Sequence, residues 1–376
     1  MKFTISSNKF KKAVSLVSHL CGSNLTLPIL NNILISLKNN ILELSSTNLE
    51  IGLSLFVPVK MEKEGKITVP GKIFSDFISS LPDGDIKIEE KDLVMNIKCK
   101  GFRAKILGQD SKDFPVLPQI KEERLTKLET SDVVSGFSKV SHIVSSSDAR
   151  VEISGILMKI EKKNLKLVGT DSIRLSEKKI NLPEETKKTL IIIPQKTAVE
   201  LNYIFSNFSG TISVTVDPSQ ISFDFKAKDP LDPKITLVSR LIEGQYPEYE
   251  EIIPKETKTR ATLDREELQK KIKIASLFSS RIQDVKLAFR PAKSQKEGSL
   301  LISAASSEVG ETTSEIKGKI EGNPLEITFN WKYLLDGISV INSSEIFLGA
   351  NDPTSPTILK PIGDETYLYV LMPKTI

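Results

Sequence analysis

The sequence predicts an α+β fold in which three repeated domains each carry two amphipathic helices on antiparallel sheets. The main observation is a unit that recurs at residues 67–81, 190–206 and 327–341. In each copy an apolar strand is followed by a lysine and then by apolar residues at helical spacing. The three lysines, Lys72, Lys196 and Lys332, are 124 and 136 residues apart in a chain of 376 residues. Such near-equal spacing is typical of an internal triplication.

A further amphipathic helix is expected near the start of each third, over residues 8–21, 131–144 and 264–278. Asp264 and Glu267 form a capping-box pattern at the start of the last of these. Apolar residues recur every three or four positions, which predicts one buried stripe per helix. In the recurrent unit, the predicted apolar faces include Ile73 and Val199. The lysines beside these stripes are most simply a solvent-exposed face when each helix is considered alone.

Between and after the helices, short apolar segments separated by turn residues predict antiparallel hairpins. In the first third these segments are 33–37, 41–46 and 49–59, with Asn39 and Asn40 at the first turn. Stretches rich in proline and charge at 115–126 and 254–260 interrupt the periodicity and predict linkers. We therefore expect domains at residues 1–122, 123–254 and 255–376.

The composition is that of an ordinary globular protein, with 39% hydrophobic residues, 27% charged residues and a formal net charge of +4. That charge is too small to identify a nucleic-acid partner by itself. No apolar run reaches the roughly 18 residues of a membrane span, and the first residues lack the apolar core of a signal peptide. Cys21 and Cys99 are too few for a disulfide framework. We expect a cytoplasmic protein with no membrane partner.

No catalytic constellation is found in the sequence. His19 and His142 fall in expected helices, where a surface position is a simpler explanation than a general base. Asp110 and Asp113 could offer carboxylates to Mg²⁺, but a polar loop is again the simpler explanation. The common phosphate-binding, nucleophile and metal-binding motifs do not occur. The sequence favours a binding or scaffolding protein that needs no cofactor of its own.

Six stretches of the chain resemble the bacterial DNA polymerase III β subunit family, the sliding clamps. They include LTLPILNNILI, VGTDSIRLS and YVLMPKTI, and they follow the order of that family at 25–35, 45–53, 168–176, 191–201, 239–254 and 369–376. The resemblance spans the whole length and includes the triplication. It implies the DNA clamp fold, in which two copies join head to tail as a homodimer and close a ring with the helices around the hole.

The resemblance also implies a function and partners. A clamp encircles duplex DNA without sequence specificity and tethers the DNA polymerase III alpha subunit, as a non-catalytic processivity factor in DNA replication. A clamp loader complex uses ATP to open the ring, and other polymerases and repair proteins bind through short clamp-binding motifs. Two alternatives stay open from the residues alone. One is a scaffold of three α+β repeats that binds proteins but no DNA, and the other is an enzyme whose site has no recognised motif.

Basic residues on the inner helices would hold duplex DNA without reading it, because phosphate attraction is independent of base sequence. Lysine suits this role as a hydrated point charge on a flexible stem. In the implied ring, the residues expected to face DNA are Lys9, Lys12, Lys72, Lys139, Arg150, Lys196, Lys270, Lys273 and Lys332.

By resemblance, a pocket for clamp-binding peptides lies between the second and third domains. Apolar residues such as Leu175 and Val370 would offer surface to leucine or phenylalanine anchors. Ser172, Ile173 and Glu251 depart from residues common in the family, which would shift the peptide preference. The expected lining is Ile153, Thr170, Ser172, Ile173, Arg174, Leu175, Pro247, Glu251, Ile252, Pro356, Val370, Leu371, Met372, Pro373 and Lys374.

The ring interface is expected between the first domain of one protomer and the third domain of its partner. An edge strand with Phe102, Ala104 and Ile106 would meet the end of the helix that carries Leu277 and Phe278. Arg281 and Lys286 follow this helix and are expected near acidic partners. A heterologous contact that closes after two copies gives a ring and not a filament.

Overall fold

The computed structural model describes residues 1–22, 26–118, 120, 122, 124–144, 150–229, 232–292 and 297–374. The chain forms two compact units. The first comprises Met1–Val134, Leu182–Lys187 and Val199–Leu241, and the second comprises Ser135–Asn181, Lys188–Ala198 and Ile242–Ile376. Within the described ranges, no helix has both the length and the apolar character needed to cross a membrane.

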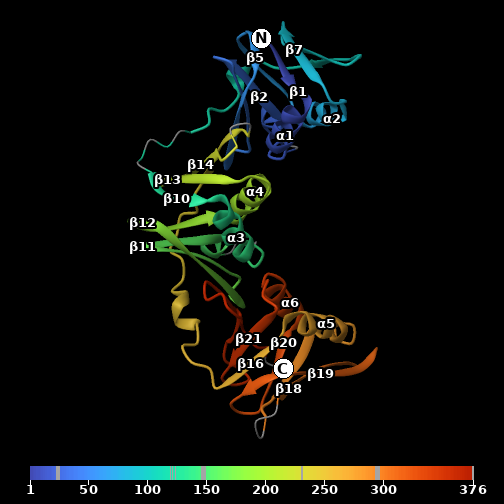
Figure 1. The fold of residues 1–376 in the computed structure, drawn as a ribbon, viewed down its shortest axis with the longest axis vertical. Coiled ribbons are helices and arrows are strands. Elements are labelled where there is room, and N and C mark those ends of the chain that lie inside the picture. The colour runs from blue at the N-terminus through green and yellow to red at the C-terminus, as the bar shows by residue number, and fades with distance from the viewer. Residues whose placement is uncertain are drawn as a thin grey trace. The chain divides into compact units, whose positions relative to one another are not determined.

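The order of elements repeats three times along the chain: a strand, a helix, a set of strands, a second helix and three final strands (Figure 1). This repetition confirms the predicted α+β fold with three domains of antiparallel sheets and two helices each. The helices are α1 (Ser7–Ser18), α2 (Gly71–Ser80), α3 (Thr130–Ser141), α4 (Gln195–Phe205), α5 (Arg265–Ser276) and α6 (Trp331–Ser339).

The strands follow the same repetition. Those of the first third are β1 (Lys2–Ser6), β2 (Asn32–Lys38), β3 (Ile41–Thr47), β4 (Ile51–Pro58), β5 (Lys60–Lys63), β6 (Gly65–Pro70), β7 (Asp85–Lys91), β8 (Val94–Cys99) and β9 (Phe102–Leu107). Those of the second third are β10 (Arg124–Glu129), β11 (Gly155–Thr170), β12 (Arg174–Pro194), β13 (Gly210–Val216), β14 (Gln220–Ala227) and β15 (Lys234–Arg240). Those of the last third are β16 (Thr259–Asp264), β17 (Asp284–Arg290), β18 (Gly298–Ser306), β19 (Gly310–Glu321), β20 (Leu325–Asn330), β21 (Glu345–Ala350), β22 (Thr357–Pro361) and β23 (Tyr367–Leu371).

Short 3₁₀ helices complete the chain: η1 (Pro28–Asn31), η2 (Ser111–Asp113), η3 (Val151–Ile153) and η4 (Tyr249–Ile252). Strands β10 and β16 begin at Arg124 and Thr259, inside the two stretches predicted as linkers. The linkers therefore end earlier than the sequence predicts, because a strand that starts in a charged stretch shows little hydrophobic alternation at its first residues.

The strands form three sheets. The first has five strands in the order β5-β1-β7-β8-β9, and the second has eight in the order β10-β13-β14-β15-β4-β3-β2-β6. The third has ten strands in the order β11-β12-β23-β22-β21-β16-β19-β18-β17-β20. The second and third sheets thus contain strands from neighbouring thirds of the chain.

Neighbouring thirds meet through the same two-strand contact. In the first unit, β15 pairs antiparallel with β4, and Leu237 lies opposite Leu53. In the second unit, β23 pairs antiparallel with β12, and Tyr369 lies opposite Ser176. In both cases the last strand of one third of the chain pairs with a strand of the preceding third. Each contact therefore joins two neighbouring repeats of the chain through one continuous sheet.

The helices of the first third pack on each other and on the sheets through one apolar stripe (Figure 1). Phe10 of α1 and Phe74 of α2 meet edge to face with ring centroids 5.7 Å apart. The predicted inward positions of Ile73 and Val199 are wrong, since these side chains are 62% and 49% exposed. Ile73 precedes the buried Phe74 by one residue, and one residue rotates a helix position by about 100°.

Helices α5 and α6 also lie side by side, in the second unit (Figure 1). Leu268 and Ile272 of α5 share one buried core with Leu334 and Ile338 of α6. Asp264 caps α5 by accepting a hydrogen bond from the Glu267 backbone N–H at 2.7 Å, as the capping pattern predicts. Because Leu268 and Ile272 face the core, the lysines of α5 lie on the side of the helix away from it.

Candidate functional site

The turn between β11 and β12 is rigidly built, and the expected peptide pocket begins there. The Thr170 hydroxyl donates to the Arg174 carbonyl at 2.7 Å and accepts from the Ser172 N–H at 3.1 Å. The Asp171 carboxylate accepts from the N–H groups of Ile173 and Arg174 at 3.0 and 2.9 Å. Ser172 adopts a positive φ of 75°. The side chain of Ile173 is 45% exposed at the tip, where a partner could touch it.

Arg174, expected as a polar contact for a peptide, is already bound on three sides. Its side chain is 10% exposed and its Nε donates to Asp171 at 2.9 Å. Its Nη1 forms an ion pair with Asp336 of α6, and its guanidinium lies 4.3 Å from the Tyr333 ring centroid. These contacts fix β12 of the second repeat to α6 of the third repeat. The main role of Arg174 in this structure is therefore to hold these two repeats together.

Leu175 and Val370 lie opposite each other on β12 and β23 and are only 1% and 2% exposed. Both belong to a buried cluster that also contains Ile153, Tyr246 and Tyr249. The expectation that Leu175 and Val370 offer apolar surface is therefore wrong for this structure, because they form the covered floor. The exposed apolar side chains around them are Ile173 and Ile252, at 45% and 47%, with Met372 partly exposed.

The C-terminal segment borders the same turn. β23 ends at Leu371, and the next N–H, of Met372, donates to the Ile173 carbonyl at 2.9 Å. Lys374 then binds the last domain, because its N–H donates to the Thr328 carbonyl at 2.7 Å and its ammonium to the Ile282 carbonyl. Pro373 lies between these two anchors, and the two residues that follow Lys374 fall outside the described ranges. Residues 372–374 are thus held at both ends beside this turn.

The segment that carries Pro247, Glu251 and Ile252 is fixed by a neighbouring charge network. The Tyr249 hydroxyl donates to the Glu177 carboxylate at 2.7 Å in a buried position, and burial raises the pKa of Tyr249. Glu250 accepts from the ammonium groups of Lys166 at 2.9 Å and Lys159 at 3.1 Å. The hydrogen bond from the Lys166 ammonium has the largest effect in lowering the pKa of the Glu250 carboxyl to about 2. Pro356 immediately precedes β22.

Most of the lysines expected to face DNA are exposed on the helices. Lys9 and Lys12 lie on α1, Lys72 on α2, Lys270 and Lys273 on α5, and Lys196 and Lys332 at the first turns of α4 and α6. The ammonium of Lys332 lies 5.5 Å from the Trp331 ring centroid. Flexible ammonium groups in such positions can reach a nearby phosphate with little rearrangement.

Lys139 is an exception. Its side chain is 13% exposed, its ammonium lies 3.6 Å from the Asp364 carboxylate, and it sits 5.0 Å from the Tyr367 ring centroid. Burial, together with the nearby charge of Lys178, lowers the pKa of Lys139. The expectation that Lys139 points to solvent is wrong, because an acidic and an aromatic residue of the last third cover it.

Arg150 lies beside the peptide turn. Its Nη1 donates to the Ser172 hydroxyl at 3.0 Å, and its Nε lies 3.3 Å from the Glu152 carboxylate. The structure thus brings together two residues that the sequence assigns to different partners, DNA and peptide. Of the two histidines, His19 is exposed as expected, and it stacks on Tyr203 at 4.0 Å and contacts Glu200 at 3.0 Å. His142 differs from expectation, because it is half-buried after α3.

No group of three or more histidine, cysteine, aspartate or glutamate side chains within the described ranges could hold a metal ion. Asp110, considered for Mg²⁺, instead caps η2 by accepting from the Lys112 N–H at 3.0 Å.

Comparison with known families accounts for the whole repeat. Models of the DNA polymerase III beta subunit match its N-terminal domain at residues 1–118, its central domain at 127–248 and its C-terminal domain at 250–375. The chain belongs to the DNA polymerase III beta subunit family. This result confirms the resemblance seen in the sequence.

Curated relatives and solved structures of this family match end to end. The Beta sliding clamp of Bacillus subtilis (strain 168) is 29% identical over 387 aligned residues, which cover 99% of both chains. The crystal structure of the DNA polymerase sliding clamp from Bacillus subtilis superposes with a TM-score of 0.92 at 28% identity, covering 100% of this chain and 99% of that one. The DNA polymerase III subunit beta from Pseudomonas aeruginosa gives 0.91 at 25% identity, with full coverage of both.

Of the residues expected at a ring interface, those of the first third lie on a strand at a sheet edge. β9 is the outermost strand of the five-stranded sheet, with Phe102 53% exposed and Ala104 half-buried. Ile106 is on the same edge strand, where it is only 7% exposed and pairs with Met95 of β8.

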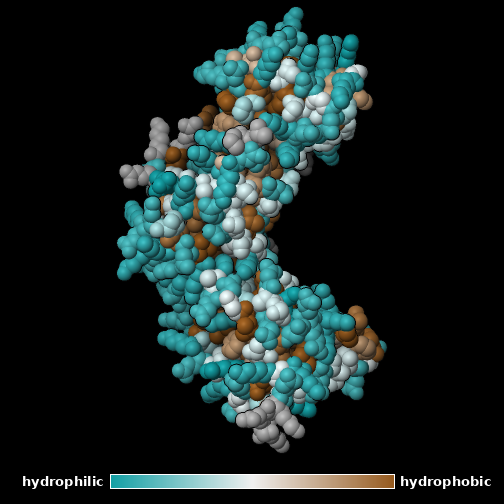
Figure 2. All heavy atoms as spheres, in the orientation of Figure 1, coloured by the Kyte–Doolittle hydropathy of each residue, from teal (hydrophilic) through white to brown (hydrophobic). Residues whose placement is uncertain are grey.

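The opposite side of the expected interface is in the last third. Leu277 is 70% exposed, whereas Phe278 packs against the core. Figure 2 shows a hydrophobic patch at the right edge of the view, where α5 and the β18–β19 hairpin meet. The exposed large apolar residues of these elements are Ile274, Leu277 and, at the hairpin turn, Val309. Sequence reasoning missed β19 as part of this surface, because its exposed residues are mostly polar.

The acidic partners of the two basic residues lie within the same third of the chain. Arg281 contacts Glu308 at 2.9 Å, and Lys286 contacts Glu326 at 3.7 Å. All four side chains are at least half exposed, so each pair contributes little to stability.

Proposed function

We propose that this chain is a sliding clamp of DNA replication, a non-catalytic ring that encircles duplex DNA and tethers a polymerase. The observation that carries the proposal is the match over 99% of both chains to a Beta sliding clamp, together with a TM-score of 0.92 to a clamp structure. The ring consists of three domains per chain, at 1–122, 123–254 and 255–376. Its partners are the DNA polymerase III alpha subunit, an ATP-dependent clamp loader complex, and other polymerases and repair proteins with clamp-binding motifs. It works in the cytoplasm.

The ring forms by head-to-tail dimerisation, and the repeated strand contact supports this. β15 pairs with β4 and β23 pairs with β12, so the third member of the series is β9 of one protomer beside β19 of its partner. β9 ends its sheet, and the first part of β19 has β18 as its neighbour, because β16 pairs only with Lys319, Ile320 and Glu321 at the far end of β19. Both edges therefore have backbone groups to offer.

The register of this contact follows from the other two. Ala104 occupies the position of Leu237 and Tyr369, because each lies opposite the inward residue of the preceding strand, Ile97, Phe223 and Leu359. Thr312 occupies the position of Leu53, since their partners Ala304 and Ser46 each follow two buried apolar residues on the inward face, Leu300 and Ile302 in β18 and Leu42 and Leu44 in β3. Ala104 then lies opposite Thr312 of the partner subunit.

That register has a consequence for charge. The neighbour of Ala104 on β9, Lys105, comes to lie opposite Glu311 of the partner subunit, and Arg103 lies diagonal to the same glutamate. Opposite charges on facing strands favour the pairing, and they also select against the wrong partner strand.

The exposed lysines of the helices line the hole and hold the duplex through its phosphates. We expect the protein, loaded by its clamp loader, to remain on nicked circular DNA and to leave linear DNA within seconds, because retention is topological. Changing Lys9, Lys12, Lys72, Lys270, Lys273 and Lys332 to glutamate should lower the affinity for DNA and make it less salt-dependent, by about 0.9 in log–log slope per lost phosphate contact. Gel filtration of loaded complexes measures how long the protein is retained on the circular and the linear DNA. Equal retention on both forms would contradict the ring.

Partners dock in the pocket between the second and third domains. Its exposed apolar residues are Ile173 and Ile252, and Met372 is partly exposed. The charge network around Glu250 and the hydrogen bonds of Met372 and Lys374 hold the surrounding segments in place. Met372→Asp is expected to weaken capture of clamp-binding peptides at least tenfold, because it places a carboxylate on the apolar anchor site. Fluorescence anisotropy of a labelled peptide from the alpha subunit measures this. Unchanged affinity in a variant of unchanged dimer mass would exclude this site.

A further inference from the structure

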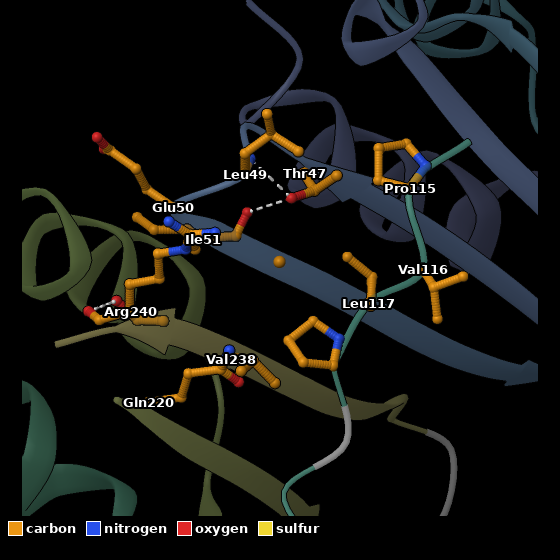
Figure 3. Close-up of a pocket in the computed structure, with 13 residues that line it drawn as sticks. Thr47, Leu49, Glu50, Ile51, Pro115, Val116, Leu117, Gln220, Val238 and Arg240 are labelled. Carbon is orange, nitrogen blue, oxygen red and sulfur yellow. Dashed lines mark hydrogen bonds between the residues drawn. The ribbon is translucent and has the colours of Figure 1, made fainter. Parts of the chain in front are cut away.

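The first unit contains a hollow that the proposed function does not use. It has a volume of about 220 Å³ and lies between the turn after β3, the ends of β14 and β15, and the segment 115–118 (Figure 3). In Figure 3, Leu117 points into its centre, with Pro115 and Val116 on one side and Glu50, Ile51 and Arg240 on the other. Its volume is below the roughly 300–1,000 Å³ of pockets for drug-sized ligands, so it suits one or two side chains of a larger partner.

The turn on its rim repeats the turn of the peptide pocket bond for bond. The Thr47 hydroxyl donates to the Ile51 carbonyl at 2.8 Å and accepts from the Leu49 N–H at 3.0 Å. The same two bonds at 170–174 measure 2.7 and 3.1 Å. Leu49 has a φ of 73°, against 75° at the tip of the other turn. Asn48 accepts from two backbone N–H groups, as the aspartate of the other turn does.

The remaining walls correspond as well. Residues 238–240 occupy the positions of 370–372, because β15 and β23 make the same strand contact in the two units. Gln220, the first residue of β14, occupies the position of Pro356, which immediately precedes β22. Phe114-Pro115 and Tyr246-Pro247 are matching aromatic–proline pairs, with the aromatic rings 6% and 5% exposed. Every wall of the hollow is thus the internal repeat of a wall of the peptide pocket.

The chemistry of the two sites differs at several points, and on the rim Glu50 stands where the other turn has Ile173. Gly52 stands in the position of Leu175, and a Cβ there would lie 2.7 Å from Leu117 Cδ2, so the chain's own leucine fills that space. Arg240 stands in the position of Met372, is exposed, and makes no ion pair with any residue in the described ranges. The apolar rim is Leu49, 44% exposed, and Val116, 93% exposed. A guanidinium beside an apolar rim is complementary to a carboxylate beside an aliphatic side chain.

We propose that this hollow is a second docking site for short extended segments of partner proteins, selective for an aliphatic anchor next to an acidic residue. The aliphatic side chain packs between Leu49, Val116 and Val238, and the carboxylate binds Arg240. The inference rests on the proposed function in so far as the other pocket, at 170–174, binds peptides. The two sites on each chain would let one ring hold two kinds of partner at once, with different sequence preferences.

The test uses the full-length dimer with labelled valine and leucine methyl groups and NMR detection. The probe is the acetylated, amidated peptide Ser-Leu-Asp-Leu-Asp-Ser at millimolar concentration, and the control peptides carry serine for leucine or lysine for aspartate. We expect the probe to shift the methyl signals of Leu49, Val116, Leu117 and Val238, and the controls to shift them less. Arg240→Glu should weaken this binding about tenfold, and Leu49→Asp should remove it.

Met372→Asp is the matched control, because it alters the equivalent position of the other pocket. The shifts at Leu49 and Val238 should persist in that variant while those at Val370 and Leu371 disappear. Loss of all shifts in Met372→Asp, or no shift at Leu49 and Val238 with any peptide, overturns the second site. Neither result touches the proposed clamp function, which is tested separately by retention on circular DNA.

Discussion

Arg103→Glu combined with Lys105→Glu on β9 is expected to convert the dimer into a monomer. In the proposed register Lys105 faces Glu311 of the partner subunit, and Arg103 lies diagonal to Glu311 and Glu315. Reversal sets like charges on facing strands, which costs several kcal/mol in each of the two interfaces of the ring. We expect the dissociation constant to rise at least about a hundredfold. Sedimentation would then report a mass near 41.7 kDa in place of twice that value.

The partner charges provide the control for this prediction. Glu311→Lys with Glu315→Lys should restore the dimer in the doubly reversed background, while each reversal alone weakens it. Lys87→Glu is the matched variant within the same sheet, because Lys87 is exposed on β7, two strands from the edge. Its mass should stay that of a dimer. A dimer that survives reversal on β9, or that is not restored by the compensating change, would show that the ring closes through another surface.

Loss of the dimer should also abolish topological retention on circular DNA, with the fold of each chain intact. The side chains at Arg103 and Lys105 are exposed, so their reversal leaves the core of the sheet unchanged. Circular dichroism of the monomer checks this. The ring is needed for retention, whereas the helices that carry the lysines do not depend on it.

The triplication and the fold class could be predicted from sequence because each depends on local periodicity. Strand–lysine–helix units at 67–81, 190–206 and 327–341 show their period without any knowledge of tertiary contacts. The edges of the proposed dimer could be predicted only in part. β9 has apolar residues that attract attention, but β19 offers a polar outer face and backbone groups, which no hydrophobicity pattern reveals.

Lys139 shows where local pattern fails. It lies off the apolar stripe of α3, which predicts exposure, yet Asp364 and Tyr367 cover it from far along the chain. Leu175 and Val370 fail for a related reason, because strand pairing places both on a covered face. Residue types and spacing locate a site along the chain, but burial within it depends on partners that are distant in sequence.

The second hollow could have been found from the sequence, since Thr47, Asn48 and Ile51 lie in the stretch that corresponds to the turn at 170–174. The floor of the hollow could not be predicted from the sequence. That Leu117 fills the space over Gly52 depends on the path of a segment without regular structure.

Arg174→Ala is expected to destabilise the second unit by about 3 kcal/mol, because it removes one partner of a nearly buried ion pair. The guanidinium is 10% exposed, and its loss leaves Asp171, 15% exposed, and Asp336 without their shared cation. The stacking on Tyr333 is lost as well. Arg174→Lys should retain part of the stability, since it keeps the charge but not the planar fork.

Asp336→Ala should cost less, about 1 kcal/mol, because that carboxylate is 47% exposed and screened by solvent. The double variant with Arg174→Ala should then fall short of the sum of the two single changes, which identifies the pair as coupled. Trp331, the only tryptophan of the chain, lies at the start of α6 and reports unfolding of this unit by fluorescence in urea.

The same variants separate the two roles of Arg174. If Arg174 serves mainly as a peptide contact, Arg174→Ala will weaken peptide capture while the urea midpoint stays unchanged. If its main role is to hold β12 to α6, the midpoint will fall, and Asp336→Ala, which leaves the arginine in place, will reproduce part of the fall. The geometry favours the second outcome, since the guanidinium already has two carboxylates and an aromatic ring as partners.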